Sequence, residues 1–170
     1  MGSNQNNSRL RIRDGSQYLI VERKTRPVIH EATIREGVPA DHAPAEEIQK
    51  AAFGDVHWPF GDEPFKVAEL AGGEMMAYLV WRQTFTEEFE ILSIATHPRH
   101  RRKGVARALI HEFCTAHRGD VFLEVRESNH GAIAFYESMG FEKTGIRHSY
   151  YGDNGEGAII MKLHNADLSL

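Results

Sequence analysis

The stretch Arg101-Arg102-Lys103-Gly104-Val105-Ala106 decides the fold, because it joins a strand-like segment, 88–96, to a helix-like segment, 104–117. The first backbone N–H groups of a helix have no partner within it, and the helix dipole adds partial positive charge there. A pyrophosphate is a natural ligand of such a place. Gly104 lets the backbone approach an anion closely, and Ala106 keeps side-chain bulk away. The stretch therefore predicts a phosphate-binding loop.

An alternative interpretation of this stretch stays open. Residues 99–103 could be a solvated run of charges in front of an ordinary helix. The loop is not a Walker P-loop, because the chain has no Gly-x-x-x-x-Gly-Lys-Ser/Thr motif. This stretch alone does not distinguish a phosphate-binding loop from a solvated run of charges.

The composition indicates one globular domain that does not bind nucleic acid. The chain has 170 residues, of which 41% are hydrophobic and 26% are charged, close to ordinary globular usage. The formal net charge of −4 argues against nucleic-acid binding, for which a basic domain is expected. A single cysteine, Cys114, cannot form an intramolecular disulfide, which fits a reducing compartment.

We expect a cytoplasmic protein without a membrane partner. No apolar run reaches the roughly 20 residues that a membrane-spanning helix needs, and the start of the chain lacks the pattern of a signal peptide. Residues 1–27 are expected to be a polar, flexible extension, although 18–21 could be a strand or a loop. Residues 28–165 are the predicted domain and 166–170 a tail. The oligomeric state stays open.

Hydrophobic periodicity predicts an α/β domain with a mostly antiparallel sheet. The expected strands are 29–35, 66–71, 74–85, 88–96, 121–126, 141–151 and 158–163, and the expected helices are 44–53, 104–117 and 129–140. Gly72-Gly73 marks a hairpin turn. Asn129 is expected to cap the third helix at its start and Gly140 to follow its end.

Beyond the loop, the chain resembles the GNAT family of N-acetyltransferases. The hexad 101–106 satisfies the family motif Gln/Arg-x-x-Gly-x-Gly/Ala. Further segments match in order and spacing, namely Leu123-Glu124-Val125-Arg126, Ser128-Asn129, Ala132-Ile133, Phe135-Tyr136, Gly140-Phe141, Tyr150-Tyr151 and Ala158-Ile159-Ile160-Met161. This wider pattern is similar to the RimI-type alanine N-acetyltransferases and covers roughly 28–163. It implies the GNAT fold, with six to seven strands in a mixed sheet and helices on both faces.

The resemblance implies acetyl-CoA as co-substrate and assigns the residues that bind it. Ile94, Ala95 and Thr96 would hold the acetyl-pantetheine arm through backbone groups. The pyrophosphate would be surrounded by the loop residues Arg101, Arg102, Lys103, Gly104, Val105, Ala106 and Arg107. Asn129 would also contact the cofactor. No metal is implied.

For catalysis, the resemblance assigns Glu124 as general base and Tyr136 as general acid. Glu124 interrupts a short strand, with Leu123 and Val125 on the opposite face. A carboxylate there needs a cavity or a partner, and the alternative is that it pairs with Arg126 on the sheet surface. For Tyr136 the alternative is packing in the core, which its helical spacing favours.

The acceptor side of the site is less well defined by the sequence. Tyr150 and Tyr151 end a predicted strand and could grip a peptide or pack on the sheet, while Trp58 and Phe60 could line the same cleft. RimI-type chains carry Glu-Asp where this chain has Glu156-Gly157, so a carboxylate is missing. The acceptor-side helix also looks shortened to the loop 57–65. Both departures lie on the acceptor side of the site, not on the cofactor side.

Histidines and the cysteine indicate no further chemistry. His111, Cys114 and His117 follow one another at three-residue steps, and surface histidines beside a packed cysteine are favoured over a metal site. Cys114 is expected to behave as a small hydrophobe and not as a nucleophile. His97 and His100 are interpreted as ordinary loop residues.

The sequence therefore predicts an acetyl-CoA-dependent N-acetyltransferase that acts by direct attack in a ternary complex. The expected acceptor is the α-amine of a protein or peptide, since an α-amine, with a pKa of about 8, loses its proton more easily than a lysine at about 10.4. A lysine, a polyamine or another small amine is the alternative acceptor. The alternative from another class is a non-catalytic acyl-CoA-binding module.

Overall fold

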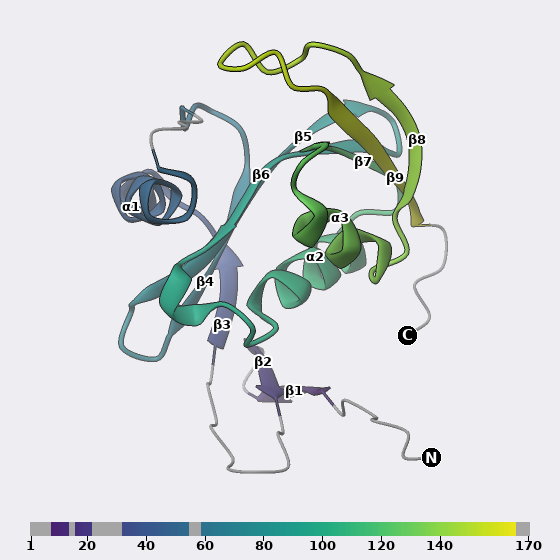
Figure 1. The fold of residues 1–170 in the computed structure, drawn as a ribbon. Helices are drawn as coiled ribbons and strands as arrows, with labels where there is room; N and C mark the ends of the chain where they lie inside the picture. Colours follow the sequence, from purple (N-terminus) through teal and green to yellow (C-terminus); the bar gives the residue numbers. More distant parts are fainter. Residues whose placement is uncertain (1–7, 14–15, 22–31, 55–58, 166–170) are drawn as a thin grey trace, which may run out of the picture. The chain divides into compact units, whose positions relative to one another are not determined.

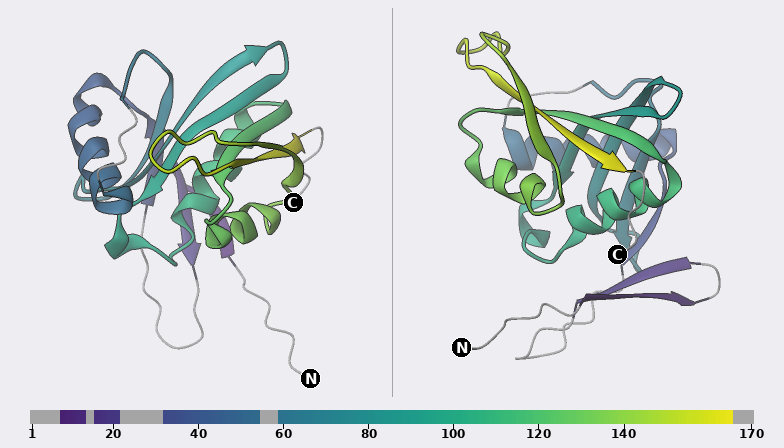
Figure 2. Two further views of the ribbon diagram at one scale, coloured as in Figure 1. Left: turned by 45° about the horizontal axis from the view of Figure 1, so that its top comes forward. Right: turned by 90° about the vertical axis from the view of Figure 1, so that its right-hand side faces the viewer.

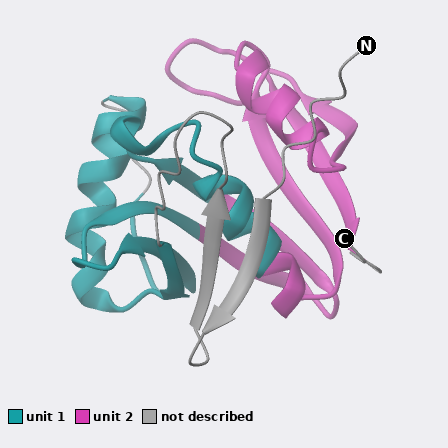
Figure 3. Ribbon diagram, turned by 90° about the horizontal axis from the view of Figure 1, so that it is seen from below, with its two compact units in different colours: residues 1–79, 93–112 teal, residues 80–92, 113–170 magenta. Residues whose placement is uncertain are grey.

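The computed structural model describes residues 8–13, 16–21, 32–54 and 59–165, with side chains from Ala32 onward. The chain divides into two compact units (Figure 3). Unit 1 comprises residues 1–79 and 93–112, and unit 2 comprises residues 80–92 and 113–170. The predicted limits of the domain, 28 and 165, stay predictions.

From β3 onward the helices and strands follow the predicted order (Figure 1), whereas β1 and β2 lie within residues 1–27, which the sequence predicts to be a flexible extension. The strands are β1 (Ser8–Arg13), β2 (Ser16–Val21), β3 (Ala32–Glu36), β4 (Phe65–Leu70), β5 (Met75–Phe85), β6 (Glu88–Thr96), β7 (Gly119–Arg126), β8 (Glu142–Arg147) and β9 (Ala158–Asn165). The helices are α1 (His42–Phe53), α2 (Val105–Ala116) and α3 (His130–Glu137), with short 3-10 turns η1 (Pro39–Asp41) and η2 (Pro98–His100). The segment 18–21, left open by the sequence, belongs to β2.

In unit 1 the neighbouring strands run β1-β2-β3-β4-β5-β6. β3 pairs with β4 antiparallel from Ala32↔Leu70 to Glu36↔Lys66. The Gly72-Gly73 turn predicted between β4 and β5 is confirmed, because the Gly73 N–H donates to the Leu70 carbonyl over 2.8 Å.

An aromatic cluster fills part of the unit 1 core. The Phe60 ring lies 5.1 Å from Tyr78, 5.5 Å from His42 and 5.8 Å from Phe65. The fully buried Tyr78 hydroxyl also shares hydrogen bonds with Gln49 and Ser93. Phe60, which the sequence offers for an acceptor cleft, therefore packs within this cluster.

Unit 2 is organised around β7. The neighbours run β5-β6-β7-β9-β8, and β7 pairs with β6 in parallel from Glu88↔Asp120 to Ile91↔Leu123. On its other side β7 pairs with β9 antiparallel along its whole length, from Gly119↔Asn165 to Arg126↔Ala158. Successive strand residues point to opposite faces, so the pairing fixes the face on which each β7 side chain lies.

The ends of α3 are built as the sequence predicts. The Asn129 side chain accepts a hydrogen bond of 3.1 Å from the Ala132 N–H, as an N-cap does. At the other end Gly140 has a φ of 93°, and the Phe141 N–H donates to the Tyr136 carbonyl over 3.1 Å. This is the Schellman arrangement, in which a residue with positive φ lets the chain leave the helix.

The end of β8 differs from the prediction. β8 stops at Arg147, whereas the sequence predicts a strand that continues to Tyr151. The Tyr151 N–H donates instead to the Glu156 carbonyl, and the Gly155 N–H donates to the Tyr151 carbonyl. Tyr150 and Tyr151 thus belong to the β8–β9 loop, which projects beyond the strands that carry it (Figure 2).

The carboxyl end of α2 is held by Asn165, the last residue of β9. The Asn165 side chain is buried and donates to the carbonyls of Cys114, over 2.7 Å, and of His117. The last carbonyls of a helix have no partner within it. His117 itself stacks on Phe113 at 4.6 Å and contacts Trp81 and Phe89. This histidine, which the sequence places at the surface, is therefore half-buried against aromatic rings.

We predict that Asn165→Ala lowers the free energy of unfolding by about 1–3 kcal/mol, because two carbonyls near the end of α2 lose a buried donor. Urea unfolding followed by circular dichroism measures the change. The neighbouring His164, whose side chain is 70% exposed and pairs with Asp120, provides the control. His164→Ala should cost less than Asn165→Ala, and equal losses would contradict this role for Asn165.

Candidate active site

The predicted pantetheine-binding residues lie at the end of β6. Ile94, Ala95 and Thr96 follow the last pair between β6 and β7, Ile91↔Leu123. Ala95 is buried, and the other two are half-buried. The next residue is fixed within unit 1, because the His97 N–H donates to the Met76 carbonyl over 2.8 Å. The end of β6 is thus an extended segment whose position is fixed by this hydrogen bond.

The predicted pyrophosphate loop turns through two residues with positive φ. Arg102 has a φ of 63° and Gly104 a φ of 81°, and α2 begins directly afterward at Val105. Positive φ is uncommon for a residue other than glycine, and such strained positions cluster at functional sites. Arg101, Arg102, Gly104 and Arg107 are exposed. An exposed helix start preceded by cations fits a pyrophosphate.

A buried histidine supports this loop. His100 is only 7% exposed, and its Nε2 lies 3.0 Å from the Glu74 Oε1. Its Nδ1 lies 3.3 Å from the Lys103 Nζ. An ammonium only donates hydrogen bonds, so Nδ1 accepts and Nε2–H donates to Glu74. The interpretation of His100 as an ordinary loop residue is therefore wrong, because it connects Lys103 to Glu74.

The predicted base, Glu124, lies on the β7 face that is not packed in the core. Leu123 and Val125, on the opposite face, are 2% and 6% exposed, as the alternation predicts. The Glu124 Oε1 lies 2.5 Å from the Arg147 Nε, and its side chain is 14% exposed. The sequence alternative of a pair with Arg126 is wrong, because Arg126 has other partners.

Two tyrosines of the β8–β9 loop lie near this carboxylate. The Tyr150 hydroxyl donates a hydrogen bond to Glu124, and this bond raises the pKa of Tyr150 to about 12. The Tyr150 and Tyr151 rings are nearly perpendicular, with centroids 5.2 Å apart. Burial raises the pKa of Tyr151 as well. Both hydroxyls therefore stay protonated near neutral pH.

The predicted acid, Tyr136, is buried on α3. Its ring packs against Phe141 with centroids 5.6 Å apart, so the packing expected from its helical spacing is present. Burial raises its pKa well above the ordinary value of 10, and a negative charge on Tyr151 would raise it further. The Tyr136 hydroxyl therefore keeps its proton across neutral pH.

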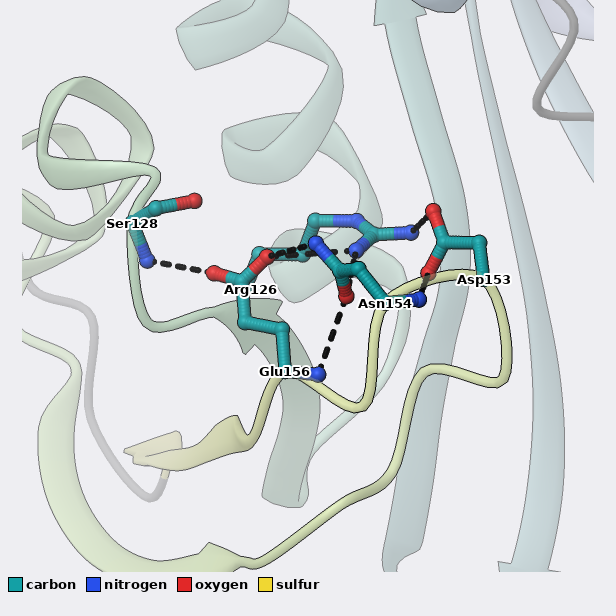
Figure 4. A network of polar contacts seen from close by, with 5 residues as sticks. All are labelled: Arg126, Ser128, Asp153, Asn154 and Glu156. Atoms are coloured by element: carbon teal, nitrogen blue, oxygen red, sulfur yellow. Dashed lines mark hydrogen bonds and ion pairs between the residues drawn. The ribbon is translucent and has the colours of Figure 1, made fainter.

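Arg126 ties the β8–β9 loop to β7 (Figure 4). Its guanidinium lies 2.9 Å from the Asp153 Oδ2 and 3.2 Å from the Glu156 Oε2. Its Cζ also lies 3.8 Å from the centroid of the Tyr151 ring. The guanidinium also donates to the Asn154 Oδ1 over 3.5 Å. One side chain thus contacts the loop at four residues, and it positions the loop that carries both tyrosines.

Glu156 extends this network to the start of α3. Its Oε1 accepts a hydrogen bond of 2.7 Å from the Ser128 N–H. The bonds from Ser128, together with those from Arg126 and Asn154, lower the pKa of Glu156 to about 2. Because this pKa is depressed, the stabilisation is fully present above about pH 4.5 and is lost only as the pH falls toward 2.

The Glu127 side chain lies beside Gly157, the position at which this chain lacks the carboxylate of RimI-type chains. A Cβ atom added to Gly157 would overlap the Glu127 carboxylate and lie 3.2 Å from the Arg147 carbonyl oxygen. The Glu127 N–H also donates to the Gly157 carbonyl over 3.2 Å. The space beside Gly157 is therefore taken by an acidic side chain from the end of β7.

The sequence does not predict the roles of Arg126, Arg147 and Glu127 in this part of unit 2. Only Arg126 carried a signal, since strand alternation places it on the same face as Glu124. The contacts of Arg147 and Glu127 depend on the β8–β9 pairing and on the course of the loop, which no local pattern encodes.

The remaining predicted features are simpler. Cys114 is 3% exposed, and burial raises the pKa of its thiol to about 12, so its thiolate is scarce near neutral pH. Trp58 lies outside the described residues.

Among the described residues there is no cluster of three or more His, Cys, Asp or Glu suited to a metal. In the same ranges, no helix is long and apolar enough to cross a membrane.

Comparison with known proteins identifies the family. Residues 31–141 match the profile of the Acetyltransferase (GNAT) family. The N-alpha-acetyltransferase RimI of Mycobacterium tuberculosis is 34% identical over 143 residues, which span 76% of this chain and 90% of that protein. An uncharacterized protein of Mycobacterium leprae is 43% identical over 76 residues, which span 44% of this chain but only 21% of that longer protein.

A solved structure agrees with these matches. The crystal structure of the ribosomal-protein-S18-alanine N-acetyltransferase from Escherichia coli superposes with a TM-score of 0.70 at 30% identity. The match covers 82% of this chain and 98% of that one. With the family profile, the loop before α2 and the mixed sheet all in agreement, the chain belongs to the GNAT family of acetyltransferases.

Proposed function

We propose that the protein transfers the acetyl group of acetyl-CoA to the N-terminal α-amine of a protein or peptide. The observation that carries this proposal is the carboxylate of Glu124 beside the paired tyrosines Tyr150 and Tyr151. The similarity to the Mycobacterium tuberculosis N-alpha-acetyltransferase, over 90% of that enzyme, supports the choice of acceptor.

Unit 1 would bind the co-substrate. The backbone of Ile94, Ala95 and Thr96 would hold the acetyl-pantetheine arm, and a backbone N–H there would polarise the thioester carbonyl. The residues that would hold the pyrophosphate are Arg101, Arg102, Lys103, Gly104, Val105, Ala106 and Arg107. Acetyl-CoA supplies an acetyl group that is activated as a thioester.

Unit 2 would move the protons. Glu124 would accept a proton from the acceptor's ammonium, directly or through water, and leave a neutral amine. The amine nitrogen forms a bond to the acetyl carbon as the carbon–sulfur bond breaks, and the nitrogen then loses its second proton to water. Tyr136, whose hydroxyl is protonated at neutral pH, would donate that proton to the departing thiolate and regain one through water. Asn129 would contact the co-substrate from the start of α3.

The charges of the β8–β9 loop favour a peptide over a polyamine. A polyamine needs several carboxylates at its ammonium spacing, but Asp153 and Glu156 already contact Arg126. Tyr150 and Tyr151 offer ring surface and hydroxyl groups, which suit a peptide backbone and its first side chains. A lysine or a small amine is the alternative acceptor, and a non-catalytic acyl-CoA-binding protein is the alternative from another class.

We predict that a peptide with a free α-amine releases CoA from acetyl-CoA, and that its N-blocked counterpart with an internal lysine does not. The lysine, with a pKa of about 10.4, is rarely neutral near pH 7. Release of CoA is followed with a thiol reagent, with spermidine tested in parallel. If only the blocked peptide or only spermidine were turned over, the α-amine would be wrong as the acceptor. Binding of CoA without any turnover would favour the non-catalytic alternative.

We predict that Gly104→Ala raises the KM for acetyl-CoA about fivefold or more. An alanine at a φ of 81° costs about 1–2 kcal/mol in the left-handed conformation, which would move the loop away from the pyrophosphate. The kcat/KM for acetyl-pantetheine, which lacks the pyrophosphate, should not change. Gly72→Ala is the control, because a Cβ atom there meets open space at an ordinary φ. An equal loss with both acyl donors would reject the loop's assigned role.

We predict that Glu124→Gln and Tyr136→Phe each lower kcat by about 10²–10⁴ while the KM for acetyl-CoA changes little, because only proton transfer is affected. Steady-state kinetics with the free-amine peptide measures both values. Phe135→Leu, on the same helix, controls for packing. If both catalytic variants kept the wild-type kcat, the assigned roles would be wrong even if the acceptor is correct.

A further inference from the structure

Arg147 covers the base of the proposed reaction from the outside. It is the last residue of β8 and pairs with Ala158 of β9. Its Nε lies 2.5 Å from the Glu124 Oε1. The two partners differ in exposure, since the Arg147 side chain is 58% exposed and that of Glu124 is 14% exposed. The carboxylate is fixed in the protein, whereas the guanidinium reaches it from solvent.

The second donor to Glu124 comes from the same short segment. The Tyr150 hydroxyl binds the carboxylate, and the Tyr150 residue is 49% exposed. The Arg147 Cζ lies 5.9 Å from the centroid of the Tyr150 ring. Between the two, Ser149 turns the backbone with a φ of 51°. Glu124 is therefore held by two half-exposed side chains from residues 147–150.

A guanidinium in this place presents to Glu124 what an ammonium presents, namely a positive charge and an N–H donor at hydrogen-bond distance. An α-ammonium must reach the same carboxylate if Glu124 is to take its proton. Arg147 and Tyr150 already donate to this carboxylate, so an ammonium that approaches from the same side meets the guanidinium. The pair seen in the structure and the proposed reaction therefore compete for one group.

We propose that Arg147 occupies, in the free enzyme, the place on Glu124 that the acceptor's ammonium takes, and that the acceptor displaces it into solvent. This inference rests on the proposed function. An ion pair with a largely exposed partner contributes little stability, so displacement costs little. The acetylated product carries no positive charge and cannot compete, so Arg147 returns to Glu124 as the product leaves. Arg147 is thus a specificity-determining residue, which makes binding depend on the charge of the amine.

The test compares the substrate peptide with its own product. Arg147→Ala should lower the KM for the free-amine peptide about two- to fivefold, the range that the loss of an exposed ion pair allows. The inhibition constant of the Nα-acetylated peptide and the KM for acetyl-CoA should not change. Arg147→Gln, which also removes the charge but keeps a long side chain, should behave in the same way. Arg147→Lys should resemble the wild type.

Arg82 provides a matched control in the same unit. Its Nη2 lies 2.5 Å from the Glu90 Oε2, and its side chain is 54% exposed, so Arg82→Ala removes an equal charge and a similar ion pair. It should leave the KM for the peptide unchanged. A similar fall of the peptide KM in Arg82→Ala would show that the net charge alone is responsible, and it would overturn the inference.

The remaining outcomes separate this inference from the proposed function. If Arg147→Ala tightened the binding of the substrate peptide and of the acetylated product equally, Arg147 would act only as a steric cover. The proposed competition between cations would then be wrong. An unchanged or higher KM for the peptide would also overturn it, although the α-amine activity would stand. If the wild type and all variants failed to acetylate free α-amines, the proposed function itself would fall.

Discussion

The pairing of β7 with β9 is the constraint on which the acceptor side of unit 2 depends. Eight residue pairs, from Gly119↔Asn165 to Arg126↔Ala158, fix which face of the sheet each β7 side chain occupies. Leu123 and Val125 point into the core, and Glu124 and Arg126 share the other face. A slip of one residue would exchange the two faces and bury both charges. The packing of apolar residues therefore also positions the charged ones.

Each unit uses one side chain to hold a loop that has little regular structure. In unit 1, His100 lies between Glu74 and Lys103 and so connects the loop before α2 to the start of β5. In unit 2, Arg126 contacts Tyr151, Asp153 and Glu156 at once. A planar guanidinium with several donors suits this task better than a lysine would.

The sequence predicts the helices and strands well because their apolar residues repeat at helical or strand spacing. Asn129 and Gly140 mark the ends of α3 by their chemistry alone. The prediction is wrong where a tertiary contact overrides the local pattern. Tyr150 and Tyr151 look like strand residues, but the contacts between Arg126 and the loop hold this segment outside the sheet. His100 is buried for the same kind of reason.

The single cysteine gives the protein a practical property. Cys114 is buried at the end of α2, and burial raises the pKa of its thiol to about 12, so maleimides and disulfide reagents, which attack the thiolate, meet almost none of it near neutral pH. An introduced surface cysteine, for example in place of the exposed Gly152, would be the one fast-reacting thiol. The wild-type chain can therefore serve directly as the background for spectroscopic labels, with no need to replace its native cysteine.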